Sequence, residues 1–280
     1  MMIGAHVSTA GGIHNAISNG TDLGCDSIQI FLKNPNQWAG KSPSESDIDQ
    51  FIERWRESPI QEILIHDIHL TNLASPKKDV LENSREQFNV QMQLAARLNI
   101  RYIVTHLGAH LDSGETEGLQ VLSDSLNLAL EQITGGDVEI LLETTAGQGT
   151  NLGYCFEHLR QIIDMSENPE RMGVCFDTCH VFAAGYNLCT DADYDETFER
   201  FDQIIGLDRL VAFHLNDAKS AFNSRVDRHD HIGEGNLGIP PFQRLVNDPR
   251  FEHTPAIIET PKMKVMHATN LAVLRGLLAG

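Results

Sequence analysis

Residues 102–143 read YIVTHLGAHLDSGETEGLQVLSDSLNLALEQITGGDVEILLE, and this stretch decides the fold class. Its two ends, 102–106 and 138–143, are short apolar runs with β-branched residues, which is typical of buried strands. Between them, residues 117–133 place apolar side chains at the spacing of an amphipathic helix. A strand, a helix and another strand in this order predict parallel strands joined by a crossover helix.

The same alternation extends over the whole chain. Strands are predicted at 2–7, 27–32, 62–66, 102–106, 138–143, 172–177, 209–214 and 256–259, with a mean spacing near 36 residues. Helices are predicted between them, and in residues 42–55 we expect Ser46 as the N-cap. Eight strand–helix units in about 250 residues favour a (β/α)8 barrel over a doubly wound sheet of five or six strands. We therefore expect an α/β fold, a single TIM-barrel domain over residues 1–280, with the active site at the C-terminal face of the strands.

The chain of 280 residues carries a formal net charge of −18, with 13 histidines and five cysteines. This acidic balance argues at first against a nucleic-acid partner, because phosphate binding normally depends on Lys and Arg. Bound divalent cations would change the balance locally, since three of them would reduce −18 to −12 and concentrate positive potential in one place. The sequence begins without a signal-peptide pattern, lacks an apolar run of about 20 residues and has no C-x-x-C pair. We expect a cytoplasmic protein with free thiols and no membrane partner.

Nearly every predicted strand ends on a residue able to bind metal or to do acid–base chemistry. In chain order these residues are His6, Lys33, His66, His106, Glu143, Asp177, His214 and Glu259. The C-terminal ends of barrel strands converge on one face, so these side chains should lie together. Burying several carboxylates together without cations would be very costly. The pattern therefore predicts a metal centre with more than one ion.

The residue types at these strand ends suit particular roles. The imidazoles of His66 and His106 suit Zn²⁺ or Mn²⁺. A carboxylate can bridge two ions, which makes Glu143 and Glu259 the natural bridging or terminal anionic ligands. The nearby His69 is interpreted as a loop histidine or a neighbour of the ligands.

Residues 173–180 read GVCFDTCH and contain Asp177 and His180. Both can face the same site only if the chain turns directly after the strand, and the two could then serve neighbouring ions. Cys175 lies in the middle of the strand among apolar residues and is interpreted as core packing. The role of Cys179 is left open, because no second cysteine lies at the spacing of a zinc ribbon.

Residues 224–235, SRVDRHDHIGEG, concentrate charge and imidazole in a short segment. Asp227, His229 and His231 have i, i+2 spacing, which places side chains on the same side of an extended segment. Two of them could hold a metal, but the spacing alone does not choose between Asp227 with His229 and His229 with His231. Arg225 and Arg228 are either phosphate-binding residues or solvated loop charges.

The chain resembles the endonuclease IV family of apurinic/apyrimidinic (AP) endonucleases over its whole length. The resemblance is carried by GAHVS, FLKNPNQW, ETTAGQGTNLG, GVCFDTCHVFAAGY, FHLNDAKSAFNSRVDRHDHIGEGNLG and IIETP. It implies a TIM barrel, in agreement with the strand spacing. It also implies cleavage of duplex DNA on the 5′ side of abasic sites, leaving a 3′-hydroxyl and a 5′-deoxyribose phosphate, and removal of blocking groups from 3′ ends.

The resemblance further implies a cofactor of three Zn²⁺ ions per chain, with Mn²⁺ possible at some sites. Carried over residue by residue, the metal ligands form three sets: His66, His106 and Glu143; Glu143, Asp177, His214 and Glu259; and His180, Asp227 and His229. Glu143 would also act in catalysis by orienting the nucleophile. The implied partner is duplex DNA with abasic sites or blocked 3′ ends, and we expect a monomer that associates with the nucleoid while it acts.

The resemblance suggests DNA contacts from loops that bend the duplex. The residues concerned are Lys33, Asn34, Asn36, His69, Leu70, Arg225 and Arg228. The sequence departs from the family pattern here, because Asn36 stands where an arginine is often found and His69 where tyrosine is usual. Asn223 replaces a usual glycine, which is a mild change because asparagine tolerates left-handed backbone angles.

Two other functions are compatible with parts of this pattern. A metal-dependent TIM-barrel sugar isomerase or epimerase also presents Glu, Asp and His at strand ends, but it needs one or two metals and leaves the set of His180, Asp227 and His229 unexplained. A non-catalytic, metal-stabilised DNA-binding module would bind abasic duplex tightly without cleaving it. The two alternatives predict sugar turnover and uncleaved complexes, respectively.

Overall fold

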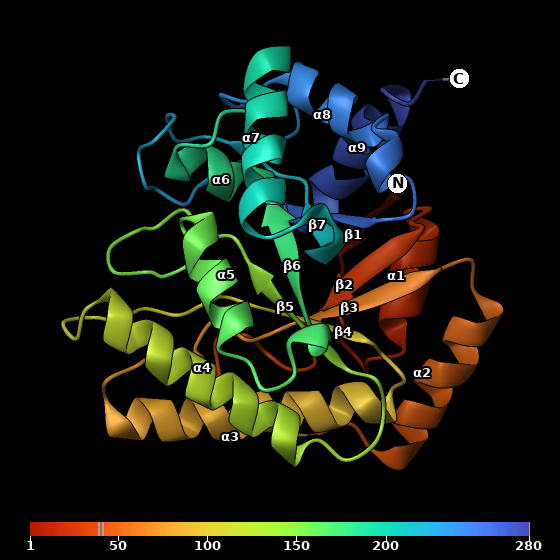
Figure 1. Cartoon of the computed structure of the whole chain (residues 1–280). Helices are drawn as coiled ribbons and strands as arrows, with labels where there is room; N and C mark the ends of the chain where they lie inside the picture. Colours follow the sequence, from red (N-terminus) through yellow and green to blue (C-terminus); the bar gives the residue numbers. More distant parts are fainter. Residues whose placement is uncertain (39, 41, 280) are drawn as a thin grey trace.

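The computed structural model describes residues 1–38, 40 and 42–279, and in this part of the chain eight parallel strands close into a barrel (Figure 1). Around the barrel the order is β1-β10-β7-β6-β5-β4-β3-β2. The strands are β1 Met2–His6, β2 Ser27–Ile30, β3 Glu62–His66, β4 Tyr102–Thr105, β5 Glu139–Glu143, β6 Met172–Asp177, β7 Leu210–His214 and β10 Pro255–Ile258. The predicted TIM barrel is confirmed.

Helices surround the barrel and connect successive strands (Figure 1). They are α1 Asn15–Asp22, α2 Glu45–Glu57, α3 Lys78–Arg97, α4 Glu115–Gln132, α5 Phe156–Asp164, α6 Thr178–Ala184, α7 Asp191–Ile204, α8 Ile239–Val246 and α9 Met263–Gly276. Two helices, α6 and α7, follow β6, and a small antiparallel pair, β8 (Asp217–Ala218) and β9 (His229–Asp230), lies in the segment after β7. In the described residues no helix combines the length and the apolar character needed to cross a membrane.

The start of α2 differs from the prediction. Ser44, and not Ser46, is the N-cap, because its hydroxyl accepts a hydrogen bond from the Asp47 backbone N–H. The Asp47 carboxylate in turn accepts from the Ser44 backbone N–H, which completes a capping box. Two backbone donors at the helix start are satisfied together, so the helix begins two residues earlier than expected.

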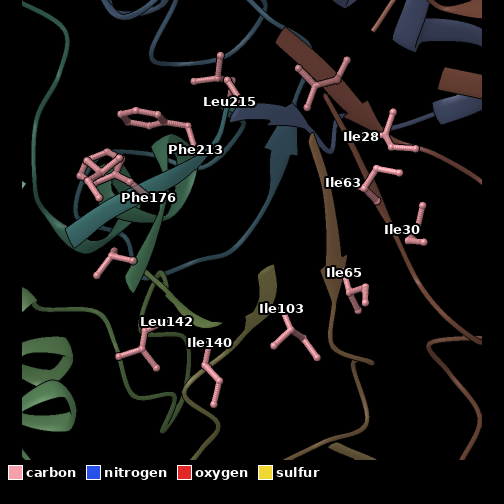
Figure 2. Packing of buried hydrophobic residues seen from close by; sticks show 14 of the residues in the cluster. Ile28, Ile30, Ile63, Ile65, Ile103, Ile140, Leu142, Phe176, Phe213 and Leu215 are labelled. Atoms are coloured by element: carbon pink, nitrogen blue, oxygen red, sulfur yellow. The ribbon is translucent and has the colours of Figure 1, made fainter. Parts of the chain in front are cut away.

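Alternate residues of the strands pack outward against the helices. Figure 2 shows part of this core, including Ile28 and Ile30 of β2 and Ile63 and Ile65 of β3. They belong to one large cluster with helix residues such as Phe88. Because side chains of a strand alternate between its faces, the residues between these isoleucines point into the barrel.

The inward side chains form a second, smaller cluster. It consists of Leu64, Val104, Leu141, Cys175, Ala212 and Ile257, all fully buried, and confirms the interpretation of Cys175 as core. Two residues further along each of these strands, the inward face changes from apolar to polar. The residues at those positions are His66, His106, Glu143, Asp177, His214 and Glu259. The apolar cluster is thus the floor beneath a polar site at the C-terminal face.

Candidate metal centre

Two imidazoles meet one carboxylate oxygen above the barrel core. The Nε2 atoms of His66 and His106 each lie 3.1 Å from Oε2 of Glu143. His66 and Glu143 are buried, whereas the side chain of His106 is 39% exposed. The three donor atoms lie within 4.8 Å of one another, so a single cation could contact all three.

The other oxygen of Glu143 faces a second group. Oε1 of Glu143 lies 3.1 Å from Nδ1 of His214, and this nitrogen lies 3.3 Å from Oε2 of Glu259. Oδ2 of Asp177 is 3.8 Å from the same nitrogen. Ligand atoms of these four residues again lie within 4.8 Å of one another. The two oxygens of Glu143 therefore belong to two neighbouring donor groups, which is the arrangement that a bridging carboxylate requires.

The third group joins α6 to the loop before β9. Nε2 of His180 lies 3.2 Å from Oδ1 of Asp227, and Nε2 of His229 lies 3.6 Å from that oxygen. Asp177 is the N-cap of α6 and accepts a hydrogen bond of 2.8 Å from the His180 backbone N–H, which provides the turn that the sequence required. His231 is bonded to Asn270 instead. The structure thus brings Asp227 and His229 together with His180.

Cys179 offers an alternative partner for Asp177 and His229, since its sulfur lies close enough to complete a set with them. Burial, however, raises the pKa of the Cys179 thiol far above its ordinary value. The thiol donates to the backbone carbonyl of Arg228. The thiol is thus bonded to the backbone, whereas ring nitrogens of His180 and His229 face the Asp227 carboxylate.

Backbone carbonyls hold two of the imidazoles in the orientation that metal binding needs. Nδ1 of His66 lies 2.6 Å from the carbonyl oxygen of Asp67, and Nδ1 of His180 lies 2.8 Å from that of Thr144. Each Nδ1 therefore carries the proton and donates it. The Nε2 lone pairs are left facing the carboxylates, as in histidine ligands whose other nitrogen is bonded to the protein.

The site accumulates opposite charges in a buried place. Burial alone would raise the pKa of Glu143, but the neighbouring His106 and His214 hold it well below the ordinary value. Burial likewise opposes charge on His180, whose pKa is nevertheless raised well above the ordinary value by Asp177 and Asp227. These nitrogen and oxygen atoms face one another so closely that protons or cations must lie between them. Imidazole and carboxylate donors are a set that Zn²⁺ accepts, so the residues fit the implied metal.

The chain is similar to known proteins over almost its whole length. Residues 18–277 match a family described as a xylose isomerase-like TIM barrel. A protein named probable endonuclease 4 from Geotalea daltonii is 49% identical over 278 residues, covering 99% of this chain and 98% of the relative. The crystal structure of endonuclease IV from Thermus thermophilus has a TM-score of 0.88 and 31% identity, covering 99% of this chain and 98% of that one. The chain belongs to the endonuclease IV family.

The barrel itself is shared more widely than the endonuclease IV family. A D-tagatose 3-epimerase-like protein has a TM-score of 0.74 at 21% identity, covering 99% of this chain and 97% of that one. At this identity the likeness shows the fold alone. Assignment of the chain to the endonuclease IV family therefore rests on the relatives of higher identity.

The predicted DNA contacts of this endonuclease IV family member lie around the site but differ in availability. Asn34, Asn36 and His69 are exposed. The ring of His69 packs edge-on against Phe31, with centroids 5.1 Å apart. The ammonium of Lys33 is already bonded within the protein, to the backbone carbonyl of Trp38 and to the side chain of Gln87.

The remaining predicted contacts also lie on loops. Arg228 is exposed and Leu70 is partly buried. The guanidinium of Arg225 lies over the ring of Tyr154, 3.8 Å from its centroid. Asn223 has φ +55°, which is the left-handed angle that asparagine tolerates.

Two cavities open beside the candidate ligands. One, of about 910 Å³, runs between the loop after β1, the loop after β2 and the start of α9, and is lined in part by Lys33, Lys262 and Lys264. The other, of about 270 Å³, is lined in part by His229 and Glu259. His6, Phe31 and Met263 line both cavities. The two cavities are therefore neighbours, and the larger one, with its three lysines, is called the basic cavity below.

Asp217, which was not among the predicted site residues, lies in β8 beside the strand of His229 and holds the segment that follows that strand. Its buried carboxylate accepts four backbone N–H bonds, from Ala218, Gly233, Gly235 and Leu237, at 2.7–3.0 Å. A Cβ on Gly235 would lie 2.5 Å from Oδ1 of Asp217, so this approach requires glycine. In the sequence, the sign of the importance of Asp217 was its position three residues after His214, at the end of a predicted strand.

We expect Asp217→Ala to destabilise the protein by about 2–4 kcal/mol, because it leaves several buried backbone donors without an acceptor. It should also weaken metal binding by His180, Asp227 and His229. Denaturant unfolding and metal content per chain would measure both effects. Asp202→Asn is the control, since this exposed carboxylate bonds one backbone N–H, that of Leu207. Equal stability of the two variants would contradict the role of Asp217.

Proposed function

We propose that this chain is a DNA-repair endonuclease that hydrolyses the phosphodiester 5′ to abasic sites in duplex DNA, leaving a 3′-hydroxyl and a 5′-deoxyribose phosphate. Removal of blocking groups from 3′ ends would use the same chemistry. The observation that carries the proposal is the division of nine ionisable residues into three donor sets, two of which share Glu143. Membership of the endonuclease IV family supports it.

We assign the three sets to three zinc ions, with Mn²⁺ as a substitute at some positions. Ions held there would act as Lewis acids. They would neutralise negative charge on the phosphate and lower the pKa of bound water to about 7. Glu143 would orient the attacking water, since its buried carboxylate stays ionised and its two oxygens face two donor sets. Asp227 lies at the open side of the site, with its side chain 47% exposed, and so borders the approach of the DNA backbone.

The direct test is cleavage of a duplex that carries one central abasic-site analogue, with EDTA present and no metal added. We expect a single cut immediately 5′ of the lesion and a 3′ end that a polymerase can extend. The same duplex without the lesion is the control and should stay intact. Absence of cleavage, even after zinc or manganese is supplied, would overturn the proposal.

A sugar isomerase remains the alternative function on the same fold. It would use the donor set of Glu143, Asp177, His214 and Glu259 and leave the set of His180, Asp227 and His229 unexplained. Metal content separates the two functions, since an isomerase predicts one or two ions per chain.

The basic cavity supplies a second prediction. Lys262 and Lys264 are exposed at the start of α9 and border this cavity in a chain of net charge −18. Replacing both by glutamate should weaken binding of abasic duplex. The negative slope of log affinity against log salt should become shallower by about 0.9 for each phosphate that the variant no longer binds.

Fluorescence anisotropy at several salt concentrations measures that slope. Arg54→Glu together with Arg56→Glu is the matched control, because both arginines are exposed in the last turn of α2, just before the amino end of β3. Equal weakening by the two double variants would show a general effect of charge and would contradict a local DNA contact.

We further propose that the protein works as a monomer in the cytoplasm, at the nucleoid. All donor residues of the three sets come from one chain, which supports a monomer. The five cysteines are free thiols, as expected in a reducing compartment.

A further inference from the structure

Gln29 is a polar residue that β2 contributes to the inside of the barrel, nearer the C-terminal face than Ser27. It lies between Ile28 and Ile30, whose side chains point outward, and its own side chain is fully buried. Its strand partner in register is His6. Lys33 was predicted to be the chemically important residue at the end of this strand, but β2 ends at Ile30 and the Lys33 ammonium is bonded to Trp38 and Gln87. Gln29 therefore occupies the place that ionisable residues hold on the other strands.

The amide of Gln29 contacts two of the candidate metal ligands. Its Nε2 lies 2.6 Å from Oε1 of Glu259, and its Oε1 lies 2.9 Å from Nε2 of His214. Nε2 also lies 3.0 Å from Nδ1 of His6. If the amide were turned over, its oxygen would face a partly buried carboxylate oxygen at 2.6 Å. The carboxylate thus fixes the orientation of the amide.

This orientation determines which nitrogen of His214 carries the proton. The amide oxygen can only accept, so Nε2 of His214 must be the N–H that donates to it. Nδ1 is then left as the lone-pair nitrogen, and it is the atom that faces Glu143, Asp177 and Glu259. A carboxamide can accept a hydrogen bond from an imidazole N–H and donate one to a carboxylate at the same time. A lysine ammonium at this position could not accept, and an ionised glutamate could not donate.

We propose that Gln29 is a positioning residue for the donor set of Glu143, Asp177, His214 and Glu259. It holds His214 in the metal-binding tautomer and holds Glu259 by a charge-assisted hydrogen bond. The inference rests on the proposed zinc-dependent function. It assigns Gln29 to the set of Glu143, Asp177, His214 and Glu259 and not to the other two.

The test compares zinc retention by the wild-type protein and Gln29→Met, which has a similar length and no polar group. Zinc-loaded proteins are titrated with a chromogenic chelator, and zinc per chain is measured after removal of the released metal. We expect Gln29→Met to release one zinc per chain at a chelator concentration that leaves the wild type intact, with an affinity at that site about 10- to 100-fold weaker. On abasic duplex, kcat should fall while KM stays unchanged.

Gln91→Met is the matched control, because Gln91 is a buried glutamine whose amide also donates to a carboxylate, that of Asp67. It contacts none of the proposed ligands and should retain all of its zinc. Should Gln29→Met fail to fold, Gln29→Asn carries the same expectation, since its amide is one methylene short of both partners.

The possible outcomes separate the two proposals. A wild-type protein that binds no zinc would overturn the proposed function itself. Zinc-binding wild type with an equally retentive Gln29→Met would leave that function intact and overturn the role of Gln29. Loss of zinc from all sites together, or an equal loss in Gln91→Met, would show a general structural effect. Either result would also overturn the proposed role of Gln29.

Discussion

Glu143→Gln is expected to lower the cleavage rate at an abasic site by at least about 10³-fold, the largest effect of any substitution considered. The amide keeps the size of the side chain but removes the negative charge that both neighbouring donor sets use. Oε2 faces His66 and His106, and Oε1 faces His214, so one substitution damages two sets.

Single-turnover cleavage and metal content per chain measure this effect. The matched control is Glu139→Gln at the other end of the same strand, where the carboxylate pairs with Arg101. The control should cleave at nearly the wild-type rate. Full activity of Glu143→Gln would remove Glu143 from the mechanism, whereas equal loss in the two variants would point to a damaged strand β5.

Removal of the metal is expected to abolish cleavage and to destabilise the fold together. A ligand present at 100 to 1,000 times its dissociation constant stabilises a protein by about 2.7 to 4 kcal/mol, and the stripped protein loses this contribution. It also retains buried carboxylates and imidazoles that face one another without a cation.

The pH dependence of the stripped protein has a definite sign. Burial opposes charge on His106 and His180, but Glu143 raises the pKa of His106, and Asp177 and Asp227 raise that of His180. Their folded-state pKa values lie above the unfolded value near 6.5, so the stability they contribute is complete below about pH 6.5 and is lost as pH rises through the folded values. Metal binding requires neutral imidazoles and therefore strengthens over the same range.

Thermal unfolding of loaded and stripped protein between about pH 6 and pH 8.5 tests this sign. The difference in Tm should widen as pH rises, and zinc added back should restore both the Tm and cleavage. A difference that is constant or narrows would show that these histidines do not bind the metal.

The strands were predictable because both of their faces are buried. Runs such as 62–66 and 138–143 are nearly continuous in apolar residues, and the structure places β3 and β5 within one residue of them. The predicted N-cap of α2, Ser46, is wrong because Ser44 forms a capping box with Asp47. The capping chemistry is visible in the sequence there, but it was placed two residues too late.

The donor sets were harder to predict because they depend on distant contacts. Residue spacing alone could not separate Asp227 with His229 from His229 with His231. Asp217 fixes the segment that follows His231, because it accepts hydrogen bonds from backbone groups up to 20 positions away. Gln29 was missed for a different reason, since a polar residue between two isoleucines is meaningful only when the inward face of the strand is known.

On the inward face, apolar Leu64 and Leu141 are followed two residues later by the candidate ligands His66 and Glu143. Residues that pack the barrel and residues that carry the chemistry therefore occupy different positions of the same strands. Substitutions at the ligand positions change the chemistry, while the outward isoleucines that hold the barrel against its helices stay untouched. A barrel built in this way can acquire or lose a donor one strand at a time without first losing its fold. For redesign, the eight inward strand ends form a set of positions at which new metal or acid–base chemistry can be introduced while the packing beneath is kept constant.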